Sequence, residues 1–349
     1  MTTSEREITE QVDLCLPDGS LNPAAVGWSR VPLHRANLRG WGRTKRWEYW
    51  CVTTPTHLVA LTVSDLDFLA LNSLYLLEFA PGGLELERTA IIPGGFGVQL
   101  PDSVAGAPGS RDVVVGPQRP SGGKVRVEIR DENAGTRLRA RCLTPDRVPL
   151  EVDLLVARPP EHESLSVVVP WSGRRFQYTS KHTALPASGR VRIGGEYLEF
   201  DGDDTWAVLD HGRGRWPRTV DWNWGAASGR TDGRTVGLQF GGRWTAGSGS
   251  TENGLCVDGR LSKIGEELDW RWSTTDRLAP WTIRTPSSGQ VDLTFTPFRN
   301  RSTRTETGLI DNRTDQCFGH YDGRVRTDDG TEIAVEHLLG WAEDVHMRW

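Results

Sequence analysis

The stretch from residue 206 to residue 225, WAVLDHGRGRWPRTVDWNWG, combines four Trp, three Arg, two Asp and one His within twenty residues. In it, Asp210 and His211 precede a Gly-Arg-Gly-Arg run. Histidine titrates near neutral pH, and a neighbouring carboxylate or indole can shift its pKa, so this pair could move protons. If the glycines let the chain turn, the two side chains can reach one site. If the chain continues as a strand, they point to opposite faces. A salt-bridged loop is the structural alternative.

A second carboxylate follows the flexible segment AGSGS. Glu252 stands there in the tripeptide Thr-Glu-Asn, where it could act in acid/base chemistry or could cap a turn. We therefore predict Asp210, His211 and Glu252 as the catalytic residues.

The residues from Asp221 to Trp224 alternate in type, so a strand would place Asp221 and Asn223 on one face and Trp222 and Trp224 on the other. Trp joins a large apolar surface to a single N–H donor, which suits a flat apolar ligand or the apolar face of a sugar. The alternative is that these Trp side chains pack inside the barrels and bind no ligand. Arg213 or Arg215 could hold an anionic head group. The predicted substrate-binding residues are Arg213, Arg215, Asp221, Trp222, Asn223, Trp224, Asn253, Trp272 and Tyr321.

The C-terminal segment EHLLGWAEDVHMRW is rich in the residue types that bind divalent metals. Glu343 and His346 would share a face only on a terminal helix, and the spacing matches no metal motif. Residues 94–97 are glycine-rich but lack the Lys of a phosphate-binding loop. We predict no metal and no cofactor.

The composition limits the class of partner. The chain has 349 residues, a formal net charge of −5 and charges of both signs along its length, so nucleic acid is not an expected partner. The N-terminus is polar, and no stretch approaches the roughly 18 apolar residues of a membrane span. Five well-separated Cys indicate reduced thiols. We expect a soluble cytoplasmic protein, monomeric or homodimeric, with no membrane insertion.

The elements that must position these residues are strands, because apolar residues recur mainly with period two between Gly, Pro, Asp and Asn. Residues 124–142 predict an antiparallel hairpin with one buried face. Residues 101–123 predict a long loop. A soft break near residues 184–189 divides the chain into an N-terminal domain, 1–187, and a C-terminal domain, 188–349. Regularly spaced short strands predict an all-β fold of barrels or sandwiches.

Several blocks resemble a bacterial family known as a domain of unknown function, including GRGRWPRTVDWNWG, TENGLCVDGRLSKI, FGHYDG and GWAEDVHMRW. The DWNWG segment also resembles the D-H-N-W-G signature of double lipocalin-like (calycin) proteins. This group contains hydroxyneurosporene synthase-related carotenoid hydratases, attachment-region proteins and fungal Diels-Alderase-like cyclases. The resemblance implies two lipocalin-like antiparallel β-barrels packed side by side, with a ligand pocket in or between them. Trp222 occupies the position of the signature His and Trp224 matches, so alkene protonation by that His does not carry over.

Together these features predict a protein that binds an apolar or polycyclic small molecule in a Trp-lined pocket. The leading hypothesis is a cofactor-independent enzyme, a lyase, isomerase or cyclase, that hydrates, cyclises or isomerises its substrate by acid/base catalysis. One alternative is a non-catalytic lipid or pigment carrier. Another is a carbohydrate-active or carbohydrate-binding protein.

Overall fold

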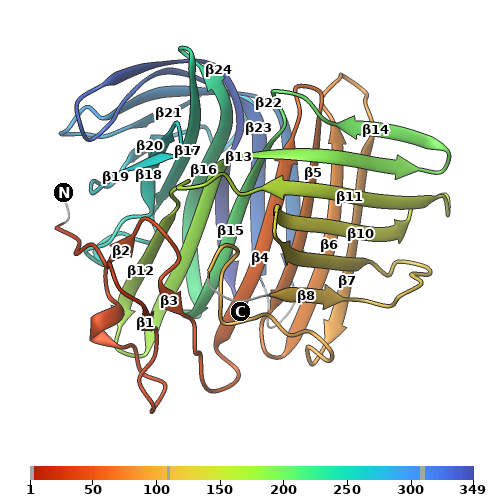
Figure 1. The fold of residues 1–349 in the computed structure, drawn as a ribbon, viewed down its shortest axis with the longest axis horizontal. Helices are drawn as coiled ribbons and strands as arrows, with labels where there is room; N and C mark the ends of the chain where they lie inside the picture. The colour runs from red at the N-terminus through yellow and green to blue at the C-terminus, as the bar shows by residue number, and fades with distance from the viewer. Residues whose placement is uncertain (1–3, 108–110, 307–310) are drawn as a thin grey trace.

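The computed structural model describes residues 4–107, 111–306 and 311–349, and almost all of their regular structure is strand. The fold is all-β, with two lipocalin-like antiparallel β-barrels packed side by side (Figure 1). In the described ranges the helical structure is one short 3-10 turn, η1 (Pro23–Ala25). No helix in them is long and apolar enough to span a membrane.

The first barrel is built from β1 to β15, and its main sheet has the order β7-β6-β5-β4-β15-β13-β11-β10-β9-β8. Its strands are β1 (Val12–Asp13), β2 (Trp28–Ser29), β3 (His34–Arg35), β4 (Thr44–Thr53), β5 (His57–Asp65), β6 (Leu69–Glu78), β7 (Glu85–Pro93), β8 (Asp112–Val115), β9 (Arg126–Glu132), β10 (Gly135–Leu143), β11 (Pro149–Ala157), β12 (Leu165–Ser172), β13 (Arg175–Ile193), β14 (Glu196–Phe200) and β15 (Trp206–Arg215).

Strand β13 is the corner of this sheet. Its first half pairs with β12 and β15, and its second half pairs with β11 and β14. The register with β15 shifts between His182 and Leu185, where Ala184 has a positive φ of 55°. Such an irregularity bends a strand. In Figure 1 β10, β11 and β14 accordingly cross β5, β6 and β7, and the apolar side chains between these layers form the first core.

The second barrel is built from β16 to β24, in the order β19-β18-β17-β16-β24-β23-β22-β21-β20. Its strands are β16 (Thr219–Thr231), β17 (Arg234–Gly242), β18 (Asn253–Val257), β19 (Arg260–Ile264), β20 (Asp269–Arg271), β21 (Trp281–Arg284), β22 (Val291–Glu306), β23 (Asp311–Arg326) and β24 (Glu332–Arg348). Large side chains such as Phe240, Trp281 and Phe295 fill its core.

The two barrels meet through an apolar contact between β4, β5, β6 and β15 on one side and β16, β23 and β24 on the other. Cys51, Ala60 and Val208 contribute from the first barrel, and Trp224 and Trp341 from the second. Strands such as β5 are therefore buried on both faces. This explains why its sequence, HLVALTVSD, reads as a nearly continuous apolar run.

The predicted hairpin over residues 124–142 is confirmed as β9 and β10, with Leu138 opposite Ile129. The loop expected over residues 101–123 is wrong in part, because β8 lies within it and buries Val113 and Val115; residues 108–110 lie outside the described residues. The terminal helix considered for Glu343 and His346 is also wrong, since β24 continues to Arg348. The predicted domain division at 187/188 falls inside β13, whereas the sheets divide between β15 and β16, and the domain limits stay a prediction.

Candidate functional site

A cavity of about 300 Å³ lies between the two barrels. Strands β4, β5, β6, β13 and β15 contribute to its wall on the first barrel. Strands β16 and β24 and the segment between β17 and β18 contribute to its wall on the second. Indole rings and carboxyl groups come from half of its lining residues. The lining residues are Trp47, Tyr49, Thr62, Ser64, Leu66, Leu71, Gln177, Thr179, Lys181, Asp210, Trp216, Trp222, Trp224, Trp244, Glu252, Glu343, Met347 and Trp349.

Strand alternation decides which residues of β15 reach this cavity. The turn considered at the Gly-Arg-Gly-Arg run is absent, because β15 continues to Arg215. Asp210 therefore faces the cavity and His211 faces the interior of the first barrel. Gly212 lies on the cavity side, where a Cβ atom would stand 2.1 Å from ring atoms of Trp47. The glycine is needed to admit this indole ring.

Lys181 of β13 is the single cation among the lining residues, and it is buried. Its Nζ lies 2.9 Å from Asp210 Oδ1, 3.5 Å from Glu252 Oε2 and 4.4 Å from the centroid of the Trp224 ring. Burial disfavours the ammonium form, but the carboxylates of Asp210 and Glu252 outweigh it and raise the pKa of Lys181. The side chain is therefore a fixed positive charge at neutral pH.

Glu252 stands just before β18, in contact with both the charged and the aromatic parts of the lining. Its Oε1 accepts a hydrogen bond from Trp244 Nε1 at 2.5 Å, and a Cβ atom at Gly241 would lie 2.1 Å from its Cγ. Burial raises the pKa of Glu252 to about 7, Lys181 opposes this rise, and Asp210 adds to it. The carboxyl group is thus divided between its acid and base forms near neutral pH.

Glu343 of β24 is a second carboxyl group of this kind. Its Oε1 accepts a hydrogen bond from Gln316 Nε2 at 2.7 Å. Burial raises the pKa of Glu343 to about 7; a hydrogen bond from Trp222 and the charge of Lys181 oppose the rise, and Asp210 adds to it. The cavity therefore holds two carboxyl groups able to exchange protons at neutral pH.

The remaining wall of the cavity is a cluster of indoles centred on Trp216. The ring centroids of Trp47, Trp349 and Trp244 lie 5.5, 5.6 and 5.9 Å from that of Trp216. Trp216 Nε1 donates to Gln177 Oε1 at 2.6 Å, so its polar atom is satisfied inside the protein. The cluster thus offers apolar faces to a ligand.

Four residues of the predicted site line the cavity: Asp210, Glu252, Trp222 and Trp224. The aromatic face of the Asp221 to Trp224 segment is the one directed into it. Lys181, Glu343 and the ring of Trp47 were not part of the predicted site. Lys181 is the one Lys, Arg, Asp or Glu within residues 176–187, and this isolation was the available signal, since buried Lys is rare without a partner.

His211 and Arg213 lie inside the first barrel with Glu48 and Arg111, and all four are buried. Arg213 Nη2 is 3.3 Å from Glu48 Oε1, and His211 Nδ1 is 3.6 Å from the same oxygen. Burial and the charge of Arg213 lower the pKa of His211 to about 3. The structure therefore separates His211 from Asp210 and Glu252, and it gives Arg213 a partner within the fold.

The other predicted binding residues lie outside the cavity lining, and each has a partner of its own. Arg215 donates to the carbonyls of Gly19 and Arg39, Asp221 pairs with Arg243 and His346, and Asn223 donates to the carbonyl of Glu343. Asn253 donates to the carbonyl of Glu266, Trp272 stacks on Trp281, and Tyr321 donates to the carbonyl of Trp341.

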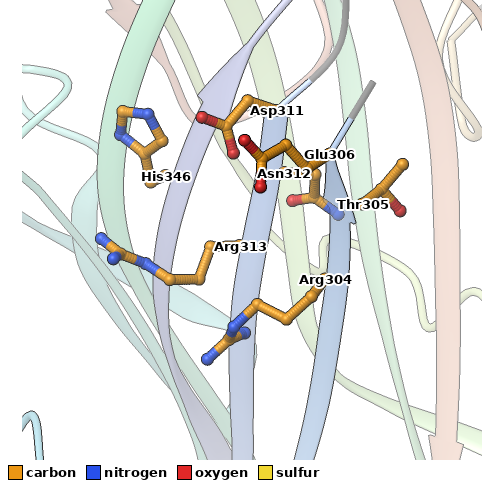
Figure 2. A pocket seen from close by; sticks show the side chains of 7 residues that line it. All are labelled: Arg304, Thr305, Glu306, Asp311, Asn312, Arg313 and His346. Carbon is orange, nitrogen blue, oxygen red and sulfur yellow. The ribbon is translucent and has the colours of Figure 1, made fainter. Parts of the chain in front are cut away.

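A second, open hollow of about 430 Å³ lies at the ends of β22 and β23. Figure 2 shows that its side chains come from the paired strand ends and from His346 of β24. Arg304 donates to Asp315 Oδ2 at 2.7 Å, and His346 Nδ1 is 2.8 Å from Asp221. Because the hollow is polar and these groups are already paired, it is poorly suited to an apolar ligand. In the described ranges, no three His, Cys, Asp or Glu side chains are grouped to hold a metal ion.

The fold and this cavity define a class of protein, the double lipocalin-like β-barrel proteins with a ligand-sized pocket between the barrels. The chain belongs to the family of the domain of unknown function DUF2804, whose model matches residues 5–349. Family membership thus extends over both barrels and every residue of the cavity.

Similar solved structures include a protein assigned as AttH from Nitrosomonas europaea, with 12% identity, a TM-score of 0.45 and coverage of 86% of this chain and 92% of that one. Kievitone hydratase from Nectria haematococca has 11% identity, a TM-score of 0.44 and coverage of 88% and 89%. CghA with Sch210972 has 8% identity, a TM-score of 0.42 and coverage of 97% of both chains. Among curated proteins, none matches the chain.

Proposed function

We propose that the protein binds an apolar or polycyclic small molecule between its barrels and converts it, without a cofactor, by acid/base catalysis. The observation that carries this proposal is the presence of two buried carboxyl groups, Glu252 and Glu343, whose pKa values are both raised to about 7 in one Trp-lined cavity. Groups that titrate near the working pH are the most effective general acids and bases. A carrier of an uncharged lipid or pigment needs only apolar walls.

The proposed reaction uses the two carboxyl groups in opposite protonation states. The protonated one donates its proton to a carbon or oxygen atom of the bound molecule, and the ionised one accepts a proton from water or from another carbon. The substrate, with water where water adds to it, gains one proton and loses one. The protons in a hydration, cyclisation or isomerisation therefore balance without any co-reactant other than water. Burial is the main cause of the raised proton affinities of the two carboxyl groups, which Asp210 increases further and Lys181 decreases.

This assignment retains Asp210 and Glu252 from the sequence-based set, adds Glu343 and Lys181, and gives His211 a structural role inside the first barrel. Trp222 and Trp224 bind the substrate. We further propose that the protein acts in the cytoplasm as a monomer or homodimer.

Native mass spectrometry of the purified protein, followed by incubation with an extract of apolar metabolites, tests the proposal. We expect one compound to be bound, and to be converted by the wild type and by the control Glu336→Gln, whose residue is exposed on β24. The double variant Glu252→Gln and Glu343→Gln keeps acceptor oxygens for its hydrogen bonds, so it should stay folded. At compound concentrations high enough to occupy its cavity it should still convert none of the compound. A compound that is bound but never converted by the wild type would favour the lipid or pigment carrier. A bound sugar would favour carbohydrate recognition.

A further inference from the structure

The cavity contains more acidic than basic groups. Among the lining residues the carboxyl groups are those of Asp210, Glu252 and Glu343, and the one cation is Lys181. Asp210 forms the closer ion pair with Lys181, at 2.9 Å against 3.5 Å for Glu252. When all three carboxyl groups are ionised, their negative charge exceeds the single positive charge of Lys181, whose Nζ lies 3.5 Å from Glu252 Oε2. Burial makes each of these charges costly unless a cation enters the cavity.

The aromatic wall is suited to the same kind of ligand. Indole faces attract cations, and the attraction is strongest when water is excluded. Lys181 already uses the face of Trp224 in this way, at 4.4 Å. Trp47, Trp222 and Trp349 each meet Trp216 edge to face, and all four line the cavity. Rings of this type next to an excess of carboxyl groups form the kind of site that binds alkylammonium groups.

One further cation lies at the rim. Lys45 of β4 is buried, its Nζ is 4.9 Å from the centroid of the Trp349 ring, and it donates to the carbonyl of Leu66 at 3.3 Å. Lys45 is four residues before Tyr49 on β4, which corresponds to about 13 Å along an extended strand. Burial lowers the pKa of Lys45 to about 8, so its charge weakens just above neutral pH. Three carboxylates still outnumber the two ammonium groups.

We propose that the natural ligand is an apolar amine, bound as its ammonium ion beside Glu252 and Glu343. The ionised carboxyl pairs with the cation, and the protonated one remains available as the acid. This inference rests on the proposed function and names its substrate class. It reverses the expectation that Arg213 or Arg215 holds an anionic head group, since neither lines the cavity. Binding of the cation replaces a missing counter-charge, whereas a carboxylate ligand would add a like charge to a buried acidic site.

The pH dependence follows from the groups around each carboxyl. Those acting on Glu343 are Lys181, Asp210, Arg301, Trp222, Tyr49, Tyr321 and Cys317. Those acting on Glu252 are Lys181, Asp210, Trp244 and Lys263. Both carboxyls have pKa values of about 7, so they lose their protons between slightly acid and slightly alkaline pH. Affinity for a permanent cation should therefore rise over this interval, and affinity for a neutral molecule should not.

Isothermal titration calorimetry with three probes of one shape tests the proposal: adamantyl trimethylammonium, adamantyl methanol and adamantane carboxylate. At about pH 8 we expect the ammonium probe to bind at least tenfold more tightly than the carboxylate probe, with the affinity of the alcohol between them. One desolvated cation–π contact or charge pair is enough to give a difference of this size. At about pH 5.5 the difference should shrink several-fold. Glu343→Gln and Glu252→Gln should each weaken binding of the ammonium about tenfold and leave the alcohol unchanged, and Glu336→Gln should change neither.

Each other outcome has a defined meaning. Equal or tighter binding of the carboxylate would overturn the amine assignment and point to Lys45 as an anionic anchor, while the alcohol's binding would leave the apolar pocket intact. Ammonium affinity independent of pH and of both Gln variants would also overturn it. Failure of all three probes to bind would overturn the proposed function together with this inference.

Discussion

Replacing Glu343 by Gln is expected to stabilise the protein at alkaline pH and to change its stability little at acid pH. The side chain is buried on β24, and its pKa is raised from 4.5 to about 7, chiefly by burial. Between these two values the folded protein holds a proton that the unfolded chain has lost. The free energy of unfolding therefore falls as the pH rises through this window. Gln removes the titration and keeps an acceptor oxygen for Gln316 Nε2.

The magnitude follows from the pKa values. Each tenfold change in an ionisation constant corresponds to about 1.4 kcal/mol, so a pKa moved from 4.5 to about 7 costs the folded state about 3 kcal/mol once the group is ionised. The unfolding entropy is roughly 2 cal/mol/K per residue, and for 349 residues the cost corresponds to about 4 °C in Tm if both barrels unfold together. The shift is larger if the second barrel unfolds alone.

Differential scanning calorimetry at about pH 4.5 and about pH 8 measures this effect. The Tm of Glu343→Gln minus that of the wild type should increase by about 4 °C between the two pH values, while Glu336→Gln should show no such increase. A difference that stays constant with pH would refute the reasoning, because it would mean that Glu343 has the same pKa in the folded and unfolded states. Such a result would also remove the main support for Glu343 as an acid/base residue.

Trp222→Ala should weaken binding of an apolar probe roughly tenfold, because the cavity loses apolar indole surface. If calorimetry shows unchanged affinity, Trp222 does not bind the ligand and serves only in packing. Glu48→Gln should lower the free energy of unfolding by about 3 to 5 kcal/mol, because two buried guanidinium groups lose their carboxylate partner; urea denaturation with wild-type stability would contradict this. Gly212→Ala should lower the free energy of unfolding by ~1–3 kcal/mol, because its Cβ would stand 2.1 Å from the Trp47 ring. The control Gly173→Ala, where nothing lies within 4 Å of the added Cβ, should leave the stability unchanged. Equal Tm values for both variants would contradict the close approach of Trp47 to Gly212.

The sequence by itself determined the class of fold and part of the site. Period-two alternation identifies strands such as β9 and β10 because one face is buried and the other is wet. The alternation of Asp221 to Trp224 also showed that its two Trp share a face. A strand such as β5 carries apolar residues on both faces, so its sequence indicates burial but does not say which face meets the other barrel.

The tertiary structure decided which charged residues meet. Asp210 and His211 are neighbours in sequence, yet the absence of a turn in β15 sends one to the cavity and the other into the first barrel. Lys181, Glu252 and Glu343 are far apart along the chain and converge only because the outer wall of one barrel packs against the other. The sequence pattern of one segment indicates only the periodicity of that strand. The pKa values and the chemistry of this site depend on burial and charge that several strands contribute together.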